Sequence, residues 1–291
     1  MKRTFNVWIE AAAIVGLLLG ACGAAMPQSA PGGQSGQTQQ PAQSQDKSKT
    51  PEATPLTLDA APPVSAEEDA AYKAFQALPS TDQAKRIEQG EAFVQKYPQS
   101  RYLPVIYSSL TIAYMQANQI PKMLETGDKA VALTPNDVTT LAILAQTISR
   151  VTNSTTPNAA QQLQKAETYS KKAIEIVPTL PKPATLTDEA FTAAKNQALV
   201  AAHSGLGLVY VKRGKNEEAI PELEASVKLD PTPDPVNYYL LGLANKSTSH
   251  FEDAIAAFNK CAEIPGSMQP TCKAQAEDAK KKSATELSAP K

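Results

Sequence analysis

The sequence predicts an all-α fold in which helical hairpins stack into a solenoid behind a disordered N-terminal tether. Two observations favour this fold. The segment from Ala66 to about Lys282 reads as helical throughout. Within it, Val200–Pro233 and Pro235–Met268 repeat one pattern of small and large residues at the same spacing. A pattern that recurs at a fixed period is typical of proteins whose repeats pack only on their neighbours.

The first residues, 1–21, have the pattern of an export signal. Lys2 and Arg3 precede a short apolar run from Ala11 to Ala21 that is broken only by glycine. Such a run is about half as long as the roughly 20 residues that cross a bilayer. A basic start, a short apolar core and small residues predict a cleaved signal rather than a membrane span.

Leu19-Gly20-Ala21-Cys22 closes this signal and resembles the lipobox of bacterial lipoproteins. The resemblance implies cleavage before Cys22 and a lipid on its sulfur. It thus implies an envelope protein that is anchored to a membrane by lipid and faces the periplasm. It also favours the outer membrane, because Gly23 stands where inner-membrane lipoproteins of some diderm bacteria carry Asp. The alternative is an ordinary signal cut near Ala25, which leaves a soluble periplasmic protein.

Residues 22–65 are predicted to be a disordered linker. They are rich in Gln, Ser, Pro, Gly and Ala and contain few large apolar residues. Such a composition buries too little surface to offset the entropy of ordering the chain. A flexible tether of this length reaches roughly 35 to 40 Å, which would hold the folded part clear of the membrane.

The clearest repeat is Val200–Pro233, in which Gly207, Tyr210, Ala219 and Pro231 mark the pattern. It resembles the 34-residue tetratricopeptide repeat (TPR), a pair of antiparallel helices that approach closely at small residues. The proline ends the second helix, because it lacks an N–H donor and its ring collides with the preceding turn.

The resemblance extends over a solenoid predicted at 66–285. Its clearest repeats are 104–137, 138–178 with an insertion around "TNSTTPN", 200–233 and 235–268. Residues 179–199 break the spacing, and Thr187 followed by acids predicts a helix cap there. We therefore expect one long helix over Asp188–Lys212, extended beyond its neighbours. Residues 269–285 are expected to form a helix that covers the last repeat.

Cys261 and Cys272 remain once Cys22 is assigned to lipid. A pair of cysteines in an oxidising envelope predicts a disulfide, worth about 3 kcal/mol in the chain-entropy model. The alternative is two free cysteines that pack in the core.

The composition argues against several function classes. A formal net charge of −1 gives no reason to expect nucleic acid as a partner. "GLGLVY" lacks the third glycine of a dinucleotide loop and follows no predicted strand. His203 and His250 belong to no recognisable nucleophile motif. We expect no enzyme, no cofactor and no metal site.

In proteins with such repeats, the first helix of each hairpin lines a concave groove that binds partners. The resemblance places the following residues in that groove: Ser108, Ile112, Met115, Ser204, Leu208, Val211, Lys212, Tyr239, Leu243 and Lys246. Apolar groups predominate among them, which favours an amphipathic helix or an extended peptide as the ligand. The alternative is that the chain's own extended helix fills part of this surface.

The sequence therefore predicts an envelope-anchored scaffold that binds a protein or peptide partner. The alternative is a permanent structural subunit of an envelope assembly machine. The junction "FVQKYPQSRYLP" before residue 104 resembles junctions in barrel-assembly lipoproteins and periplasmic cell-division coordinators, which keeps that alternative open.

Overall fold

The computed structural model describes residues 64–288 of the 291-residue chain. This part contains eleven α-helices, one 3-10 turn and no strand, which confirms the predicted all-α fold. The predicted signal, Cys22 and the linker up to residue 63 lie outside the described residues. None of the described helices is both long and apolar enough to cross a membrane. In chain order the elements are α2 (Ala66–Gln76), α3 (Gln83–Lys96), α4 (Leu103–Gln116), α5 (Ile120–Leu133), α6 (Val138–Val151), α7 (Ala159–Ile176), η2 (Val177–Thr179), α8 (Asp188–Lys212), α9 (Asn216–Leu229), α10 (Pro235–Ser247), α11 (Phe251–Glu263) and α12 (Gln269–Ser288).

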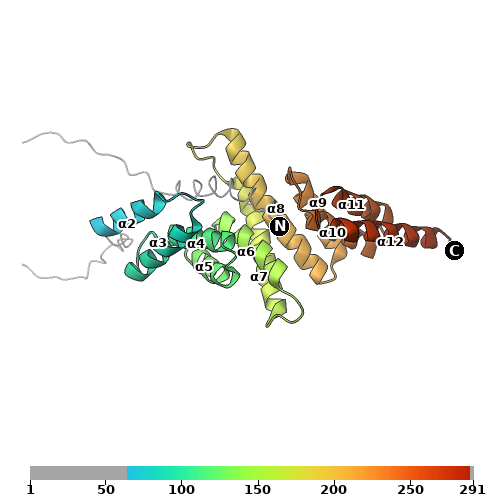
Figure 1. The fold of residues 1–291 in the computed structure, drawn as a ribbon, viewed down its shortest axis with the longest axis horizontal. Helices are drawn as coiled ribbons and strands as arrows, with labels where there is room; N and C mark the ends of the chain where they lie inside the picture. The colour runs from blue at the N-terminus through green and yellow to red at the C-terminus, as the bar shows by residue number, and fades with distance from the viewer. Residues whose placement is uncertain (1–63, 289–291) are drawn as a thin grey trace, which may run out of the picture.

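The helices form successive hairpins that run from α2 at one end of the molecule to α12 at the other (Figure 1). The pairs α4–α5, α6–α7, α8–α9 and α10–α11 each pack along their length, and α12 packs on α11 as the last described helix. Each hairpin contacts mainly the hairpin before and after it, as expected for a solenoid.

The same turn closes three of these hairpins. Asn118, Gly214 and Ser249 each adopt a left-handed backbone with φ between 56° and 72°. The residue after each donates its N–H to a carbonyl five residues back, over 2.8 Å in the first hairpin and 2.9 Å in the other two. This bond satisfies a carbonyl at the end of the first helix. The repeated geometry makes α4–α5 structurally equivalent to α8–α9 and α10–α11.

The close approach of α10 and α11 requires a small residue. In α10, a Cβ added to Gly242 would lie 2.6 Å from the ring of Phe258 in α11. Phe258 is fully buried in this position. The glycine therefore lets the aromatic ring lie directly against the backbone of α10.

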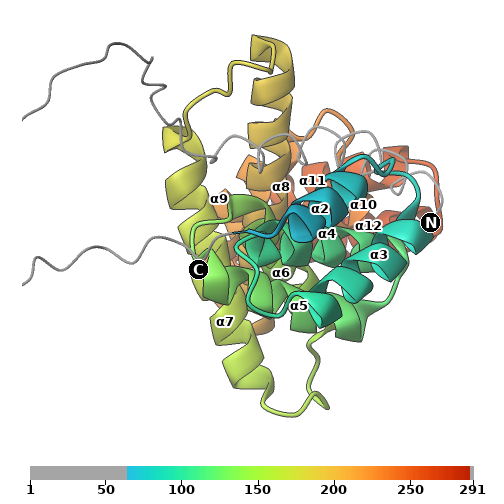
Figure 2. The same cartoon turned by 90° about the vertical axis from the view of Figure 1, so that its left-hand side faces the viewer.

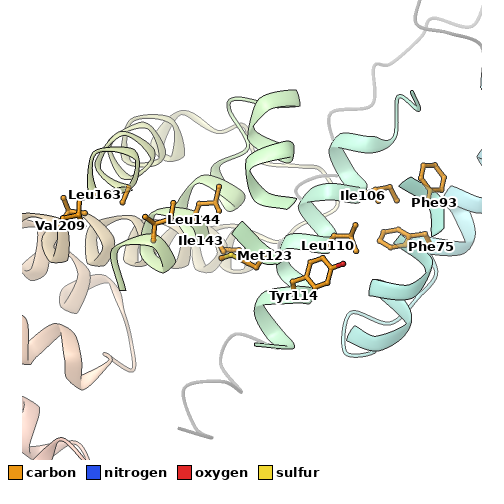
Figure 3. Close-up of a cluster of buried hydrophobic side chains, with 12 residues drawn as sticks. Phe75, Phe93, Ile106, Leu110, Tyr114, Met123, Ile143, Leu144, Leu163 and Val209 are labelled. Atoms are coloured by element: carbon orange, nitrogen blue, oxygen red, sulfur yellow. The ribbon is translucent and has the colours of Figure 1, made fainter. Parts of the chain in front are cut away.

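A continuous apolar core joins the helices from α2 to α7 with α8. In Figure 3 it runs from Phe75 and Phe93 through Leu110 and Tyr114 to Leu144 and Val209. Most of these side chains are less than 4% exposed. Replacing a core residue of this size by alanine typically costs about 2 to 5 kcal/mol. A second cluster, around Leu206, Leu223 and Leu241, lies between α8, α9 and α10.

Two segments project from the stack (Figure 2). One is the loop from residue 152 to residue 158 before α7, where the sequence predicts an insertion. The other is the N-terminal end of α8 with the segment that leads to it from α7. Thr187 caps α8 by accepting a hydrogen bond from the N–H of Ala190 over 3.2 Å. The range of α8 matches the long helix that the sequence predicts.

The backbones of α8 and α6 approach each other closely where the two helices cross. Ala201 and Ala202 of α8 pack on Leu141 and Ala142 of α6, and all four are at most 2% exposed. A Cβ on Gly205 would lie 3.0 Å from the backbone carbon of Ala145. The two backbones approach this closely because no large side chain lies between them.

We expect Gly205→Leu to destabilise the protein by about 2 to 3 kcal/mol, because the new side chain meets backbone rather than a movable side chain. Equilibrium unfolding in urea measures this change. Ala193→Leu is the matched control, because it introduces the same side chain at an exposed position of α8 and should change stability by less than about 0.5 kcal/mol. Equal losses in both variants would contradict the close approach.

Candidate protein-binding surface

The side chains predicted to line a groove lie on α4, α8 and α10. These are the first helices of the first, third and fourth complete hairpins. The structure gives most of these side chains partners within the chain, and it leaves apolar groups partly exposed on two separate parts of the surface.

Ser108 and Ser204 are buried and bind the next hairpin. Ser108 of α4 donates its hydroxyl proton to Asp137, which also caps α6 and accepts from the Thr140 hydroxyl over 2.6 Å. Ser204 of α8 donates to Asn237 of α10 over 2.7 Å. The serine at this position therefore links one first helix to the next in both places.

Asn237 completes the second of these polar contacts. It is 1% exposed, and its amide nitrogen donates to the Ser226 hydroxyl of α9 over 3.1 Å. Ser226 in turn donates to the carbonyl of Val200 over 3.3 Å. One buried amide thus joins α8, α9 and α10, and every polar group in the contact has a partner.

The lysines among the predicted residues are also engaged. The ammonium of Lys212 donates to the carbonyls of Ser149, over 2.6 Å, and of Thr152 at the end of α6. Those carbonyls have no partner within their own helix, so the lysine caps α6. Burial lowers the pKa of the Lys212 ammonium. Lys246 of α10 is bound by Gln275 and Asp278 of α12.

The first helix of the second complete hairpin, α6, is covered by α8. Thr139, Ala142 and Ser149 of α6 are at most 8% exposed. The C-terminal half of α8 covers α6 through Ala201, Ala202 and Gly205. The N-terminal end of α8 projects from the stack instead (Figure 2). Arg150 of α6 also reaches Asp234, directly before α10, over 3.0 Å. The first-helix surface is therefore interrupted at α6.

Two apolar parts remain on either side of this interruption. Ile112 and Met115 of α4 are partly exposed at the edge of the first core cluster, and we call them the N-terminal patch. Leu208 and Val211 of α8 are partly exposed at the edge of the second cluster, and we call them the C-terminal patch. Tyr239 and Leu243 of α10 pack in the cluster that α12 covers.

The histidines have ordinary structural partners. Nδ1 of His203 in α8 lies 2.6 Å from a carboxylate oxygen of Glu222 in α9, so the pair joins the two helices of one hairpin. His250 is exposed and lies 3.2 Å from the Thr248 hydroxyl. Between residues 64 and 288 no group of three or more His, Cys, Asp and Glu side chains is placed to hold a metal ion.

Sequence reasoning missed the residues that link neighbouring hairpins, Asp137, Arg150, Asp234 and Asn237. A signal existed for two of them. Asp137 and Asp234 each stand directly before a predicted first helix, where Asp is a preferred N-cap. The structure shows both as caps, and each binds a second helix as well. Nothing in the spacing marked Arg150 or Asn237.

We expect Asn237→Leu to cost about 2 to 3 kcal/mol, because it leaves the Ser204 hydroxyl without its acceptor in a buried site. Urea unfolding measures the loss. Asn259→Leu makes the same substitution at an exposed position of α11 and should be nearly neutral. A neutral Asn237→Leu would show that the buried contact contributes nothing.

Part of the chain matches a known repeat family, and its fold is similar to solved structures of such proteins. The family model of the tetratricopeptide repeat matches residues 200–233 and 236–267. Among solved structures, the chain is similar to a thermophilic TPR protein of Thermus thermophilus, with 18% identity, a TM-score of 0.44, and coverage of 73% of this chain and 98% of that one. It is also similar to a MamA RS-1 double mutant, with 16% identity, a TM-score of 0.48, and coverage of 68% and 94%. No curated protein sequence matches the chain. The matched residues lie in α10–α11 and in α9 with the part of α8 from Val200 onward, and these segments are tetratricopeptide repeats.

Proposed function

We propose that this protein is an envelope-anchored scaffold that binds a protein partner through its apolar first-helix patches. The observation that carries the proposal is the family match over residues 200–233 and 236–267, because tetratricopeptide repeats generally mediate protein–protein interactions. The binding surface consists of the N-terminal and C-terminal patches. Both are apolar and partly exposed, which suits an amphipathic helix or an extended apolar peptide.

The anchor belongs to the same proposal. Its support is the sequence pattern at the N-terminus, where Leu19-Gly20-Ala21-Cys22 follows a basic start and a short apolar run. The Cys261–Cys272 disulfide agrees with export, because such bonds persist mainly in oxidising compartments. The protein would face the periplasm and be held by lipid on Cys22, in the outer membrane because Gly23 follows the cysteine.

Replacing Cys22 by Ser should release the protein from membranes into the soluble fraction, because the acyl chains have no other attachment site in the predicted lipobox. Fractionation of cells with and without the substitution measures the release, and a density gradient separates inner from outer membranes. A chain with Cys261→Ser and Cys272→Ser keeps Cys22 and should stay with membranes. A Cys22→Ser protein that still sediments with membranes would contradict the anchor.

The partner is sought by crosslinking in the native envelope, followed by purification through a C-terminal tag and mass spectrometry. We expect a specific protein in the wild-type sample and a loss of about tenfold or more for Met115→Glu or Val211→Glu, because a buried charge opposes apolar contact. Ala256→Glu places the same charge on an exposed position of α11 and should retain the partner. Circular dichroism checks that each variant is folded.

The amount of the recovered protein separates two roles. A partner recovered in near equal amount indicates a permanent subunit of an assembly, and a partner recovered in small amount indicates a transient scaffold. Recovery that is the same in all variants would show that neither patch is the binding surface.

A further inference from the structure

Helix α12 covers the last hairpin with very little apolar surface of its own. Between residues 269 and 285 its buried side chains are Cys272, Ala276 and Ala279. They are spaced so that they lie on one face of the helix. Each alanine contributes a single methyl group, so the noncovalent apolar contact is small.

The surface beneath α12 is much more apolar. Phe258 of α11 is fully buried there, and Tyr239, Leu243 and Ile255 are partly buried around it. The Tyr239 and Phe258 rings have centroids 5.9 Å apart. The last hairpin of a solenoid leaves such a face open unless another element covers it. In this protein the cover is α12.

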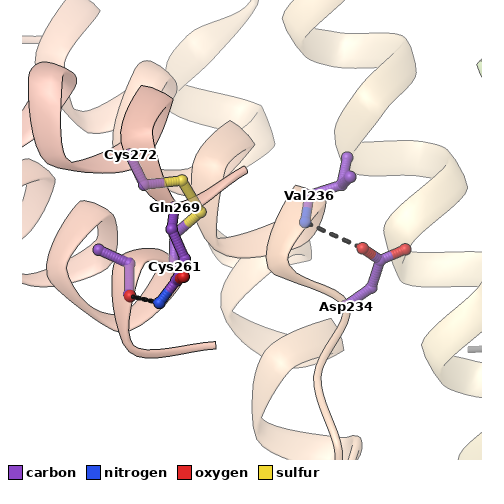
Figure 4. The surroundings of a disulfide bond; sticks show 6 residues. Asp234, Val236, Cys261, Gln269 and Cys272 are labelled. Carbon is purple, nitrogen blue, oxygen red and sulfur yellow. Dashed lines mark hydrogen bonds between the residues drawn. A yellow bond between two sulfur atoms is a disulfide. The ribbon is translucent and has the colours of Figure 1, made fainter. Parts of the chain in front are cut away.

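A few polar contacts also hold α12 on the last hairpin. Lys246 of α10 donates to Gln275 and, over 3.1 Å, to Asp278, whose side chain is 46% exposed. The Lys246 side chain is 14% exposed, so water and salt screen this pair mainly at the Asp278 carboxylate. The side chain of Gln269 donates to the carbonyl of Ala262 over 2.9 Å (Figure 4).

The covalent contact acts at the start of the helix. The Cys261–Cys272 disulfide joins α11 to the first turn of α12, with the two Cα atoms 5.8 Å apart (Figure 4). Ordering the first turn is the costly step in forming a helix, and a bond that holds this turn lowers that cost. It also keeps α12 from moving away when its weak contacts open.

We propose that this disulfide is a latch for α12. While the bond is closed, α12 lies on α11; when the bond opens, α12 detaches and exposes the apolar face around Phe258, Tyr239 and Leu243. The protein then has an oxidised, covered form and a reduced form with an open final hairpin. This inference does not depend on the membrane anchor or on the identity of any partner.

Opening requires a reductant, for which a small dithiol serves. The dithiol supplies two electrons and two protons, so that Cys261 and Cys272 become thiols and the dithiol becomes a disulfide. Both cysteines are 0% exposed, so attack on the bond must follow a transient opening of α12. The latch is therefore resistant to reduction while α12 is in place.

Hydrogen exchange of the full chain, read by mass spectrometry, tests the latch. The samples are the oxidised protein, the protein reduced with dithiothreitol, and the variant with Cys261→Ala and Cys272→Ala. We expect amides of α12 to exchange about tenfold faster or more in the second and third samples, because the loss of the ring restores the entropy of the free helix. Amides of α4 and α5 should be unchanged. Alkylation of both cysteines confirms reduction.

Lys246→Met is the matched control, because it removes the hydrogen bonds from α10 to Gln275 and Asp278 and keeps the disulfide. Its α12 amides should exchange within about twofold of the oxidised protein. Unchanged exchange of α12 in the doubly substituted variant would overturn the proposal. Faster exchange throughout the chain would also overturn it, since the bond would then support the whole solenoid rather than one helix.

Discussion

The close contact between α6 and α8 sets the arrangement of the hairpins on either side. Gly205 lies directly on the backbone of Ala145, and alanines surround this point. Two helices that meet through such small side chains have little freedom to slide or separate without opening a cavity. The apolar core before α8 and the cluster after it are joined at this crossing. The solenoid is therefore continuous in packing although its repeat spacing is broken at residues 179–199.

Polar side chains hold neighbouring hairpins together around this contact. Asp137 and Asn237 accept from serines of the preceding first helix, and Lys212 binds the carbonyl end of α6. A buried polar group that lacks a partner is costly, so each of these contacts favours one alignment of the hairpins. The same side chains would otherwise face a ligand groove. Their use in packing leaves the N-terminal and C-terminal patches as separate apolar surfaces, and a ligand that binds both would have to pass α8.

At the C-terminal end, the covering helix α12 contributes much less apolar surface than the hairpin beneath it. The last hairpin has a large apolar face around Phe258, and α12 meets it with two alanines and a cysteine. Because these groups are small, the disulfide and the hydrogen bonds of Lys246 add to a limited apolar contact. Helix α12 can therefore cover the last hairpin without adding large apolar side chains of its own.

The sequence by itself determined the helical class, the hairpin repeats from Val200 onward, the long helix over Asp188–Lys212 and the cysteine pair. These features depend on local spacing: small residues where helices meet, prolines and caps where they end, and cysteines close in the chain. Only the tertiary structure decided which groove positions are free. Ser108 and Ser204 fit a ligand-binding pattern by position, yet they bind Asp137 and Asn237, about 30 residues away. Repeat spacing specifies which face of a helix a residue occupies, whereas the packing of one hairpin on the next determines what that face meets.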